Sequence, residues 1–163
     1  ARGDLVLYSD ADLPFDMEEL PRALRLLREY DADIVSAYRF DRTAEGLQRA
    51  VYSYVYNHLV RWALGVRVRD VNFAFKLIRA GVLDHIELIS EGSFIDAELV
   101  AKANRRGFRL VQFGVDYIAR TRGVSTLSSP GVIVRMLREL RALRPEIARL
   151  DRLPAAVLDD VAS

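Results

Sequence analysis

The sequence opens with an apolar run, Leu5-Val6-Leu7-Tyr8, that is followed at once by Ser9-Asp10-Ala11-Asp12. A short apolar run of this kind predicts a buried strand, so the two carboxylates stand at its carboxyl end. In open α/β sheets the ligand crevice lies outside the carboxyl ends of the strands. Magnesium is commonly held by one or two carboxylates together with substrate phosphates. Asp10 and Asp12 are therefore candidate metal ligands, although a surface turn followed by a helix cap would also explain the pair.

The composition indicates one domain and narrows the class of protein. The chain has 163 residues, a net charge of +1 and no cysteine. This length is sufficient to bury a substantial core. The absence of cysteine excludes a disulfide framework and a cysteine-based zinc site. The small net charge argues against a general nucleic-acid binder. Because the chain begins at Ala1 rather than at a methionine, we expect the start of the protein to lie upstream.

Strands and helices are expected to alternate along the chain, which predicts an α/β fold with a mixed or mostly parallel sheet. Apolar and β-branched runs predict strands at 4–9, 33–38, 71–78 and 108–117. Helical spacing predicts helices over about 16–29, 46–63, 94–105 and 131–144. The last helix is expected to end at Arg144 because Pro145 follows. The predicted buried stripe of the second helix is Leu47, Val51, Val55, Leu59 and Trp62 or Ala63.

Candidate phosphate ligands follow the second predicted strand. Arg39 stands at its carboxyl end and is expected near the carboxylate pair. On the next helix Arg49 and Ser53 are four residues apart, so their side chains can grip one phosphate. The same spacing also suits a solvated helix face. A loop with Arg120, Gly123 and Ser125 follows the last strand and offers donors for a pyrophosphate, as many surface loops do.

Acidic residues gather where the third predicted helix begins. Asp96 and Glu98 lie in its first turns, where the helix dipole alone favours negative charge. A functional interpretation makes one of them an active-site carboxylate that orients a substrate or an arginine. Both remain candidates at this point.

In order along the chain, these motifs resemble those of family-2, GT-A-type glycosyltransferases, in particular the dolichol- and polyprenyl-phosphate sugar transferases. The matching segments are SDADLPFD, SAYRFDR, RAVYS, RDVNFAFKL, EGSFIDAEL, RRGFRLVQFGVDY and RTRGVS, and they cover residues 3 to about 143. The resemblance implies a GT-A-like (Rossmann-like) mixed sheet flanked by helices. It also implies a nucleotide-binding half of roughly 80–90 residues before the aspartate motif, so we expect the chain to be the C-terminal part of the catalytic domain.

The resemblance further implies a metal-dependent, inverting transfer of a sugar from a nucleotide sugar to a polyprenyl phosphate. Asp10 and Asp12 would bind Mg or Mn and the donor diphosphate. The acceptor phosphate would be held by Arg39, Arg49 and Ser53, and the donor phosphates by Arg120, Gly123 and Ser125. Asp96 and Glu98 would orient substrate or, if the acceptor is a glycan hydroxyl, act as base. A truncated, non-catalytic interaction domain is the alternative from another class.

The C-terminal region is expected to divide in two, after a catalytic part over residues 1–130. Residues 131–150 are expected to form an amphipathic helical segment, with apolar residues on one side and four arginines on the other. Such a helix can lie on a membrane or pack on the domain's own core. Residues 151–163 are expected to be a frayed tail. A lipid acceptor favours a cytoplasmic protein that is peripheral at the cytoplasmic face of the membrane.

Overall fold

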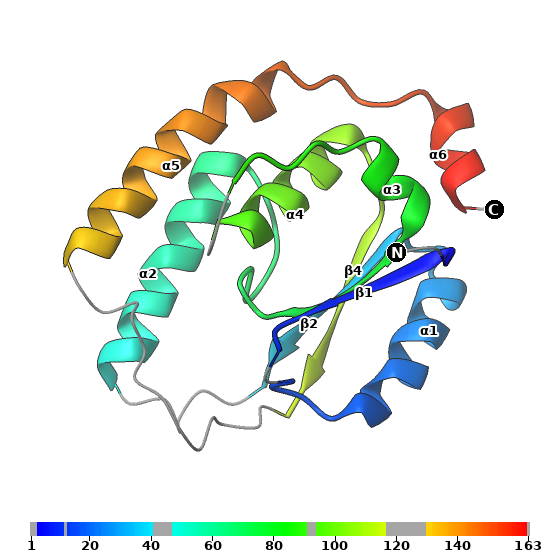
Figure 1. The fold of residues 1–163 in the computed structure, drawn as a ribbon, viewed down its shortest axis with the longest axis horizontal. Coiled ribbons are helices and arrows are strands. Elements are labelled where there is room, and N and C mark those ends of the chain that lie inside the picture. Colours follow the sequence, from blue (N-terminus) through cyan, green and yellow to red (C-terminus); the bar gives the residue numbers. More distant parts are fainter. Residues whose placement is uncertain (1–2, 12, 41–46, 91–93, 117–129, 163) are drawn as a thin grey trace.

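A computed structural model describes residues 3–11, 13–40, 47–90, 94–116 and 130–162, with the backbone alone for 47–53 and 130–137. Strands and helices alternate as the sequence predicts (Figure 1). The elements are, in chain order, β1 (Leu5–Ser9), the 3₁₀ turn η1 (Met17–Glu19), α1 (Leu20–Glu29), β2 (Ile34–Arg39), α2 (Leu47–Leu64), β3 (Phe75–Arg79), α3 (Ala80–Asp84), α4 (Ile95–Arg106), β4 (Leu110–Val115), α5 (Pro130–Arg149) and α6 (Ala155–Ala162).

The described strands form one four-stranded mixed sheet in the order β1-β3-β2-β4. β3 is antiparallel to both of its neighbours, whereas β2 and β4 are parallel. β1, β2 and β4 therefore run in the same direction. Ser9 pairs with Phe75, and Arg39 pairs with Val115. The carboxyl ends of β1, β2 and β4 thus meet the amino end of β3 at one edge, which we call the carboxyl edge.

Helices cover both faces of the sheet (Figure 1). On one face, α1 packs Ala23 and Leu27 against Val35 and Phe75 in a shared core. Asp16 caps η1 at the start of this region, because its side chain accepts a hydrogen bond from the Glu18 N–H at 2.9 Å. On the other face, the buried residues of α3 and α4 pack on β2 and β3. That cluster contains Ile34, Ile78, Val82, Leu99 and Ala103.

α2 and α5 lie side by side against α4 (Figure 1) and enclose a further core. The buried residues of α2 in this core are Tyr56, Val60 and Leu64. The predicted buried stripe is wrong at Val55 and Trp62, which are 48% and 74% exposed, whereas Leu59 is partly buried and Ala63 packs against this core. The side chains of Leu47 and Val51 lie outside the described residues. Apolar side chains surround the described part of this helix, so its pattern alone does not select the face that packs.

α5 continues through Pro145 to Arg149, so the predicted end at Arg144 is wrong. A proline inside a helix removes one backbone hydrogen bond and disfavours the helix locally. Tertiary contacts on both sides of it compensate. Leu143 and Ile147 are buried in the core with α2 and α4, and Glu146 forms an ion pair with Lys102 of α4 at 2.5 Å. In the described part of α5, the apolar side therefore faces the domain's own core.

Residues 155–162, where a frayed tail was expected, form helix α6. Leu158 and Val161 pack against the cluster that includes α3. A Cβ placed on Gly81 of α3 would lie 3.2 Å from the Val161 side chain, so the two helices are in close contact. This packing holds α6 against α3 and the cluster of buried residues over the sheet.

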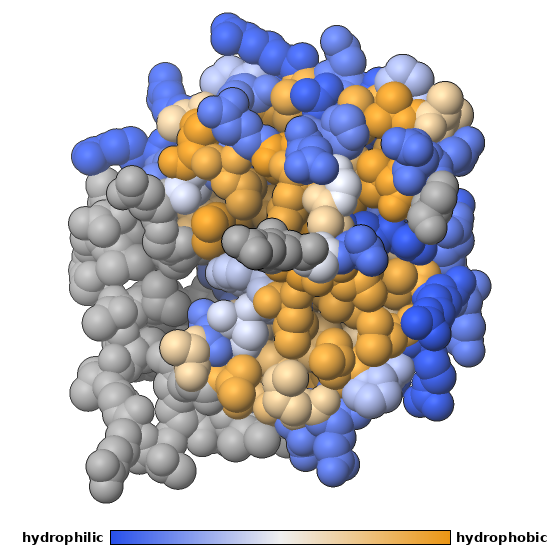
Figure 2. Space-filling model, turned by 45° about the vertical axis from the view of Figure 1, so that its right-hand side comes forward, coloured by the Kyte–Doolittle hydropathy of each residue, from blue (hydrophilic) through white to orange (hydrophobic). Residues whose placement is uncertain are grey.

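β1 is an edge strand of the sheet, with a neighbour on one side only among the described strands, and all five of its residues are only partly buried. Figure 2 turns this side of the molecule forward and shows hydrophobic side chains gathered at the level of β1 and α1. Leu5, Leu7, Leu20 and Leu24 are partly buried here, over the core beneath α1. An apolar edge strand of this kind is a pairing surface for a further strand.

Candidate active site

The carboxyl edge brings together three of the residues singled out from the sequence. Asp10 follows β1, Arg39 ends β2, and Asp96 lies in the first turn of α4. This convergence follows from the strand order, because the ends that carry Asp10 and Arg39 lie at the same edge. Arg49 and Ser53 lie on α2 with only their backbone described. Outside the described residues lie Asp12, Arg120, Gly123 and Ser125.

Asp96 forms a buried ion pair with Lys76 of β3. The Lys76 side chain is completely buried, and its Nζ also donates to the Phe73 carbonyl at 3.0 Å. The same Nζ lies 5.5 Å from the centre of the Tyr8 ring. Tyr8 and Lys76 are direct partners in the sheet, so both side chains point to the face that α4 covers. The result is a charged cluster immediately behind Asp10.

The electrostatics of this cluster oppose ionisation of Asp96. Burial raises the pKa of Asp96 above its ordinary value, and the charge of Asp10 adds to the rise. Lys76 and the hydrogen bond with the Tyr8 hydroxyl act in the opposite direction without cancelling it. Burial, with Asp96 and Asp10 nearby, raises the pKa of Tyr8 to about 12. Tyr8 therefore remains a hydrogen-bond donor at neutral pH. A raised carboxylate pKa in a charged cluster is typical of a functional site.

Glu98 faces away from this cluster, because side chains two residues apart on a helix point in different directions. Its carboxylate accepts hydrogen bonds from the N–H groups of Ile89 and Ser90 at 3.0 and 2.7 Å. It also pairs with Lys102 at 2.7 Å. Burial raises the pKa of Glu98, but these hydrogen bonds outweigh it and the pKa is lowered. Glu98 thus stabilises the segment that leads into α4.

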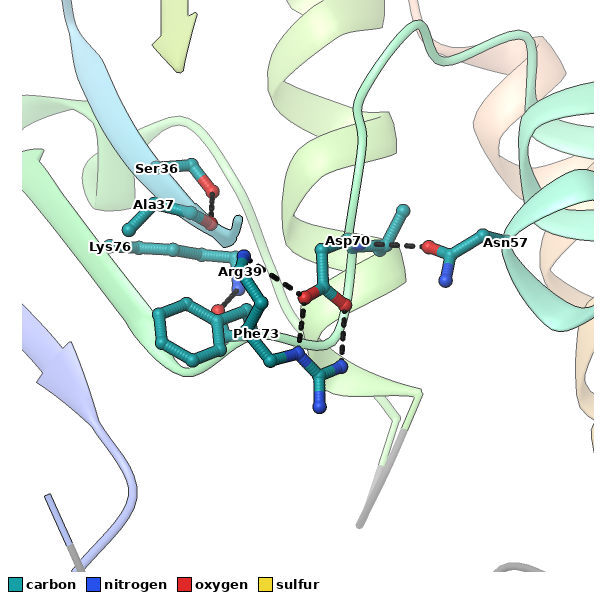
Figure 3. A network of polar contacts seen from close by, with 8 residues as sticks. Ser36, Ala37, Arg39, Asn57, Asp70, Phe73 and Lys76 are labelled. Carbon is teal, nitrogen blue, oxygen red and sulfur yellow. Dashed lines mark hydrogen bonds and ion pairs between the residues drawn. The ribbon is translucent and has the colours of Figure 1, made fainter. Parts of the chain in front are cut away.

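Arg39 is held by a carboxylate that the sequence reasoning did not assign to it. Asp70 lies before β3 and accepts hydrogen bonds from Nε and Nη2 of Arg39 at 2.6 and 2.8 Å (Figure 3). The Asp70 side chain is 1% exposed and that of Arg39 is 10% exposed. A neighbouring contact joins this turn to α2, since the Asn57 side chain accepts from the Val71 N–H at 2.9 Å. These bonds tie β2 and α2 to the same turn.

Lys76 was also missed, although the sequence does contain a signal. It is one of only two lysines in the chain, and it interrupts an otherwise apolar strand, FAFKLI. A charged residue in a buried strand requires a partner, because an unpaired buried charge is costly. The sequence does not say which acid supplies that partner.

The donor chemistry at the carboxyl edge fits a hard divalent cation. Asp10 supplies carboxylate oxygens at the end of β1, close enough to Asp96 to affect its pKa. Within the described part of the chain, no group of three or more His, Asp or Glu side chains could hold a metal ion alone. A magnesium or manganese ion needs only one or two protein carboxylates when substrate phosphates complete its shell. The residues present are consistent with that arrangement.

Comparison with known proteins identifies relatives of one kind. No model of a known protein family matches the sequence. Glycosyltransferase AglD of Haloferax volcanii is 37% identical over 122 residues, which are 72% of this chain and 20% of that protein. Dodecaprenyl-phosphate galacturonate synthase of Rhizobium johnstonii is 29% identical over 77% of this chain and 37% of that protein. The low-salt glycan biosynthesis hexosyltransferase Agl6 of Haloferax volcanii is 26% identical over 73% of this chain and 30% of that protein.

The chain thus spans between 20% and 37% of the length of these relatives. Among solved structures, mannosyl-3-phosphoglycerate synthase from Rubrobacter xylanophilus matches with a TM-score of 0.54 and 22% identity. The match covers 94% of this chain and 50% of that chain, and it shows the fold alone. The sequence relatives agree with the resemblance found in the motifs, and the structural match agrees with the α/β architecture. The chain is a homologue of glycosyltransferases, and its sheet and flanking helices have the GT-A-type architecture that this resemblance implied.

Proposed function

We propose that the complete protein transfers a sugar from a nucleotide sugar to a polyprenyl phosphate, with inversion at the anomeric carbon. The observation that carries the proposal is the convergence of Asp10, Arg39 and Asp96 at the carboxyl edge. Acids for a metal-bound donor and an arginine for an acceptor phosphate then lie at the same end of the strands. One relative is named as a dodecaprenyl-phosphate galacturonate synthase, which supports a polyprenyl-phosphate acceptor.

The acceptor side of the reaction requires positioning more than base catalysis. An oxygen of the acceptor phosphate bonds to the anomeric carbon while the bond from that carbon to the nucleoside diphosphate breaks. A phosphate monoester is already anionic at neutral pH, so no strong base is needed. Arg39 would hold the phosphate together with Arg49 and Ser53 of α2. Fixing the reacting oxygen against the anomeric carbon supplies much of the rate.

The donor side would use the acids at the end of β1. Asp10 and Asp12 would hold Mg²⁺ or Mn²⁺. When bound, this cation would neutralise the charge that develops on the departing diphosphate. Asp96 would orient the donor sugar, and Glu98 would hold the start of α4 so that Asp96 is correctly placed. The donor phosphates would be bound by the loop residues Arg120, Gly123 and Ser125.

An acceptor series tests the proposed function in the complete protein. With a labelled nucleotide sugar and Mn²⁺, we expect transfer to a polyprenyl phosphate and none to the matching polyprenol. Chelation of the metal should abolish transfer, because Asp10 and Asp12 act through the cation. Equal transfer to the polyprenol, or transfer that survives chelation, would contradict the proposal.

A glycan hydroxyl is the second candidate acceptor, and one observation favours it. A hydroxyl acceptor needs a general base, and Asp96 is a buried carboxylate with a raised pKa, as many such bases are. Transfer to a free oligosaccharide without any polyprenyl phosphate would establish this alternative. A non-catalytic interaction domain would instead show neither transfer nor thermal stabilisation by nucleotide with Mn²⁺.

A lipid acceptor also implies peripheral association with the cytoplasmic face of a membrane. Among the described residues, no helix is both long and apolar enough to cross a bilayer. The outer side of α2 exposes Tyr54 and Trp62, which are 64% and 74% exposed. Aromatic residues of these two types favour the membrane interface. Flotation with anionic liposomes should therefore weaken in Trp62→Ala, with Tyr30→Ala as control, at an exposed residue that directly follows α1.

A further inference from the structure

Asp70 holds the guanidinium of Arg39 through a bidentate ion pair, which we call the clamp. Nε and Nη2 of Arg39 donate to the two carboxylate oxygens of Asp70 at 2.6 and 2.8 Å. The Arg39 backbone N–H makes a longer bond of 3.4 Å to the same carboxylate. Two parallel bonds of this kind fix the plane of a guanidinium as well as its position. The backbone bond adds a third restraint at the end of β2.

An aromatic ring also packs against the guanidinium. Cζ of Arg39 lies 5.8 Å from the centre of the Phe73 ring, which is buried. Phe73 belongs to the same turn as Asp70, since its N–H donates to the Asp70 carbonyl at 3.1 Å. The Phe73 carbonyl in turn accepts from buried Lys76. The turn that holds Arg39 is thus itself anchored to β3.

The same turn is bonded to α2. Asn57 is 7% exposed, and its Oδ1 accepts from the Val71 N–H at 2.9 Å. By helical spacing, Ser53 and Arg49 stand one and two turns before Asn57 on this helix. One turn of four residues, 70–73, therefore connects Arg39 on β2 with the helix that carries the two other proposed phosphate ligands (Figure 3).

We propose that Asp70 is a positioning residue, which orients Arg39 toward the acceptor phosphate; this inference rests on the proposed function and deepens it. A buried carboxylate neutralises the arginine, so the pair attracts an anion less strongly than a lone cation would. What the pair supplies is a fixed position and direction for the guanidinium. A preorganised donor avoids the entropic cost of ordering a long side chain when substrate binds.

A purely structural ion pair is the competing explanation, and it makes a different prediction. Buried pairs contribute little net stability, although removing one partner is strongly destabilising. If Asp70 only stabilised the fold, its substitution would lower the melting temperature and leave the kinetic constants of the folded enzyme unchanged. If Asp70 orients Arg39, the KM for the acceptor rises while the KM for the donor does not.

The experiment compares Asp70→Asn with Asp33→Asn in the complete protein. Asp33 is a matched control because it is also a buried acid, 5% exposed, that accepts a backbone N–H, from Arg109 at 2.6 Å. It directly precedes β2, so it lies at the end of the strands away from the carboxyl edge. For Asp70→Asn we expect the acceptor KM to rise about 10-fold to 100-fold. The donor KM should stay within about twofold, and Asp33→Asn should change neither constant.

A second variant keeps the inference testable if Asp70→Asn does not fold. Arg39→Lys retains the charge and the ion pair but loses the planar fork, so it should reproduce the selective rise in acceptor KM. An unchanged acceptor KM in Arg39→Lys, or in a folded Asp70→Asn, would overturn the inference.

A readout without turnover separates this inference from the proposed function. We expect the NMR signal of the Arg39 Nε–H to be slow in exchange in the wild type and to shift on addition of a short-chain prenyl phosphate. In Asp70→Asn the signal should broaden and the shift should be lost. If the wild type shows the shift but transfers sugar to other acceptors, the proposed function fails while the clamp stands. If the shift is the same in Asp70→Asn, the clamp fails whatever the acceptor.

Discussion

Two carboxylate–lysine pairs extend from the same helix, two residues apart, and differ in what surrounds them. Asp96 pairs with Lys76 toward the carboxyl edge, and Glu98 pairs with Lys102 on another side of α4. Both acids are buried. The pKa of Asp96 is raised, whereas that of Glu98 is lowered. Two buried acids of the same helix, each paired with a lysine, therefore have pKa values shifted in opposite directions.

Burial raises the pKa of both acids, and the difference lies in how far the surrounding donors and charges offset it. Glu98 receives two backbone N–H groups in addition to Lys102, and these overcome the cost of burial. Asp96 has Lys76 and Tyr8, but Asp10 places another negative charge nearby. An acid that is fully satisfied stabilises the fold. An acid that has few hydrogen-bond donors and a second acid nearby can instead bind a ligand. A cation or a sugar would then supply the interactions that the protein does not provide.

The largest effect is expected from Asp96→Asn. Transfer should fall by about 10²-fold or more, because the proposed donor-orienting carboxylate is lost. Stability should also fall, because Lys76 keeps its charge in a buried place. The measurement is kcat for the complete protein, well below its melting temperature. A kcat equal to that of the wild type would remove the functional distinction between the two acids.

Glu98→Ala is expected to act mainly on stability. Two backbone N–H groups and Lys102 lose a buried acceptor, which should cost about 3–5 kcal/mol of the free energy of unfolding. Chemical denaturation measures this directly. Glu98→Gln serves as the control, since it keeps the acceptor oxygen and should lose less. If Glu98→Ala destabilises the protein by less than Glu98→Gln, the hydrogen-bonding account of this acid is wrong.

The two acids should also affect the pH dependence of stability with opposite signs. The folded-state pKa of Glu98 is below its ordinary value of 4.5, so its contribution is present above that pH and is lost on acidification. The folded-state pKa of Asp96 is above 3.8, so its contribution is present at lower pH and is lost as the pH rises. Unfolding titrations should therefore show a shallower acid-induced loss in Glu98→Gln and a steeper one in Asp96→Asn. Parallel curves for the two variants would contradict the opposite shifts.

Tyr8→Phe is expected to have the smallest effect. It removes one hydrogen bond to Asp96, which is worth about 1 kcal/mol. Because that bond lowers the pKa of Asp96, its loss should raise this pKa further. The acid limb of the pH–rate profile should then move to higher pH, with a few-fold loss of transfer at low pH. An unchanged profile would separate Tyr8 from the site.

Much of the fold could be predicted because it is encoded locally. The four strands were found from apolar runs, and α4 ends one residue after the predicted end at 105, where Gly107 adopts a positive φ of 99° as the helix cap. The errors arose where tertiary packing decides. α2 is apolar on several sides, so only its neighbours show that Tyr56 rather than Val55 faces inward. α5 passes through Pro145 because Ile147 and Glu146 are held by α4 and the core.

The site was predictable in part for the same reason. Asp10, Arg39 and Asp96 each follow or begin a recognisable element, so their place at the carboxyl edge could be expected. The pairing of Arg39 with Asp70 joins residues 31 positions apart in the sequence. Such a contact depends on the strand order rather than on any local pattern. The opposite roles suggested for Asp96 and Glu98 likewise become visible only when the donors around each are known.

Whether the carboxyl edge is a metal-dependent sugar-transfer site is decided by the activity of the double variant Asp10→Asn, Asp12→Asn. The assay follows transfer from a labelled nucleotide sugar to polyprenyl phosphate by the complete protein, with and without Mn²⁺. We expect transfer by the wild type that depends on Mn²⁺, and none by a double variant that still folds. Metal-dependent transfer that persists in the double variant would rule out this role for Asp10 and Asp12.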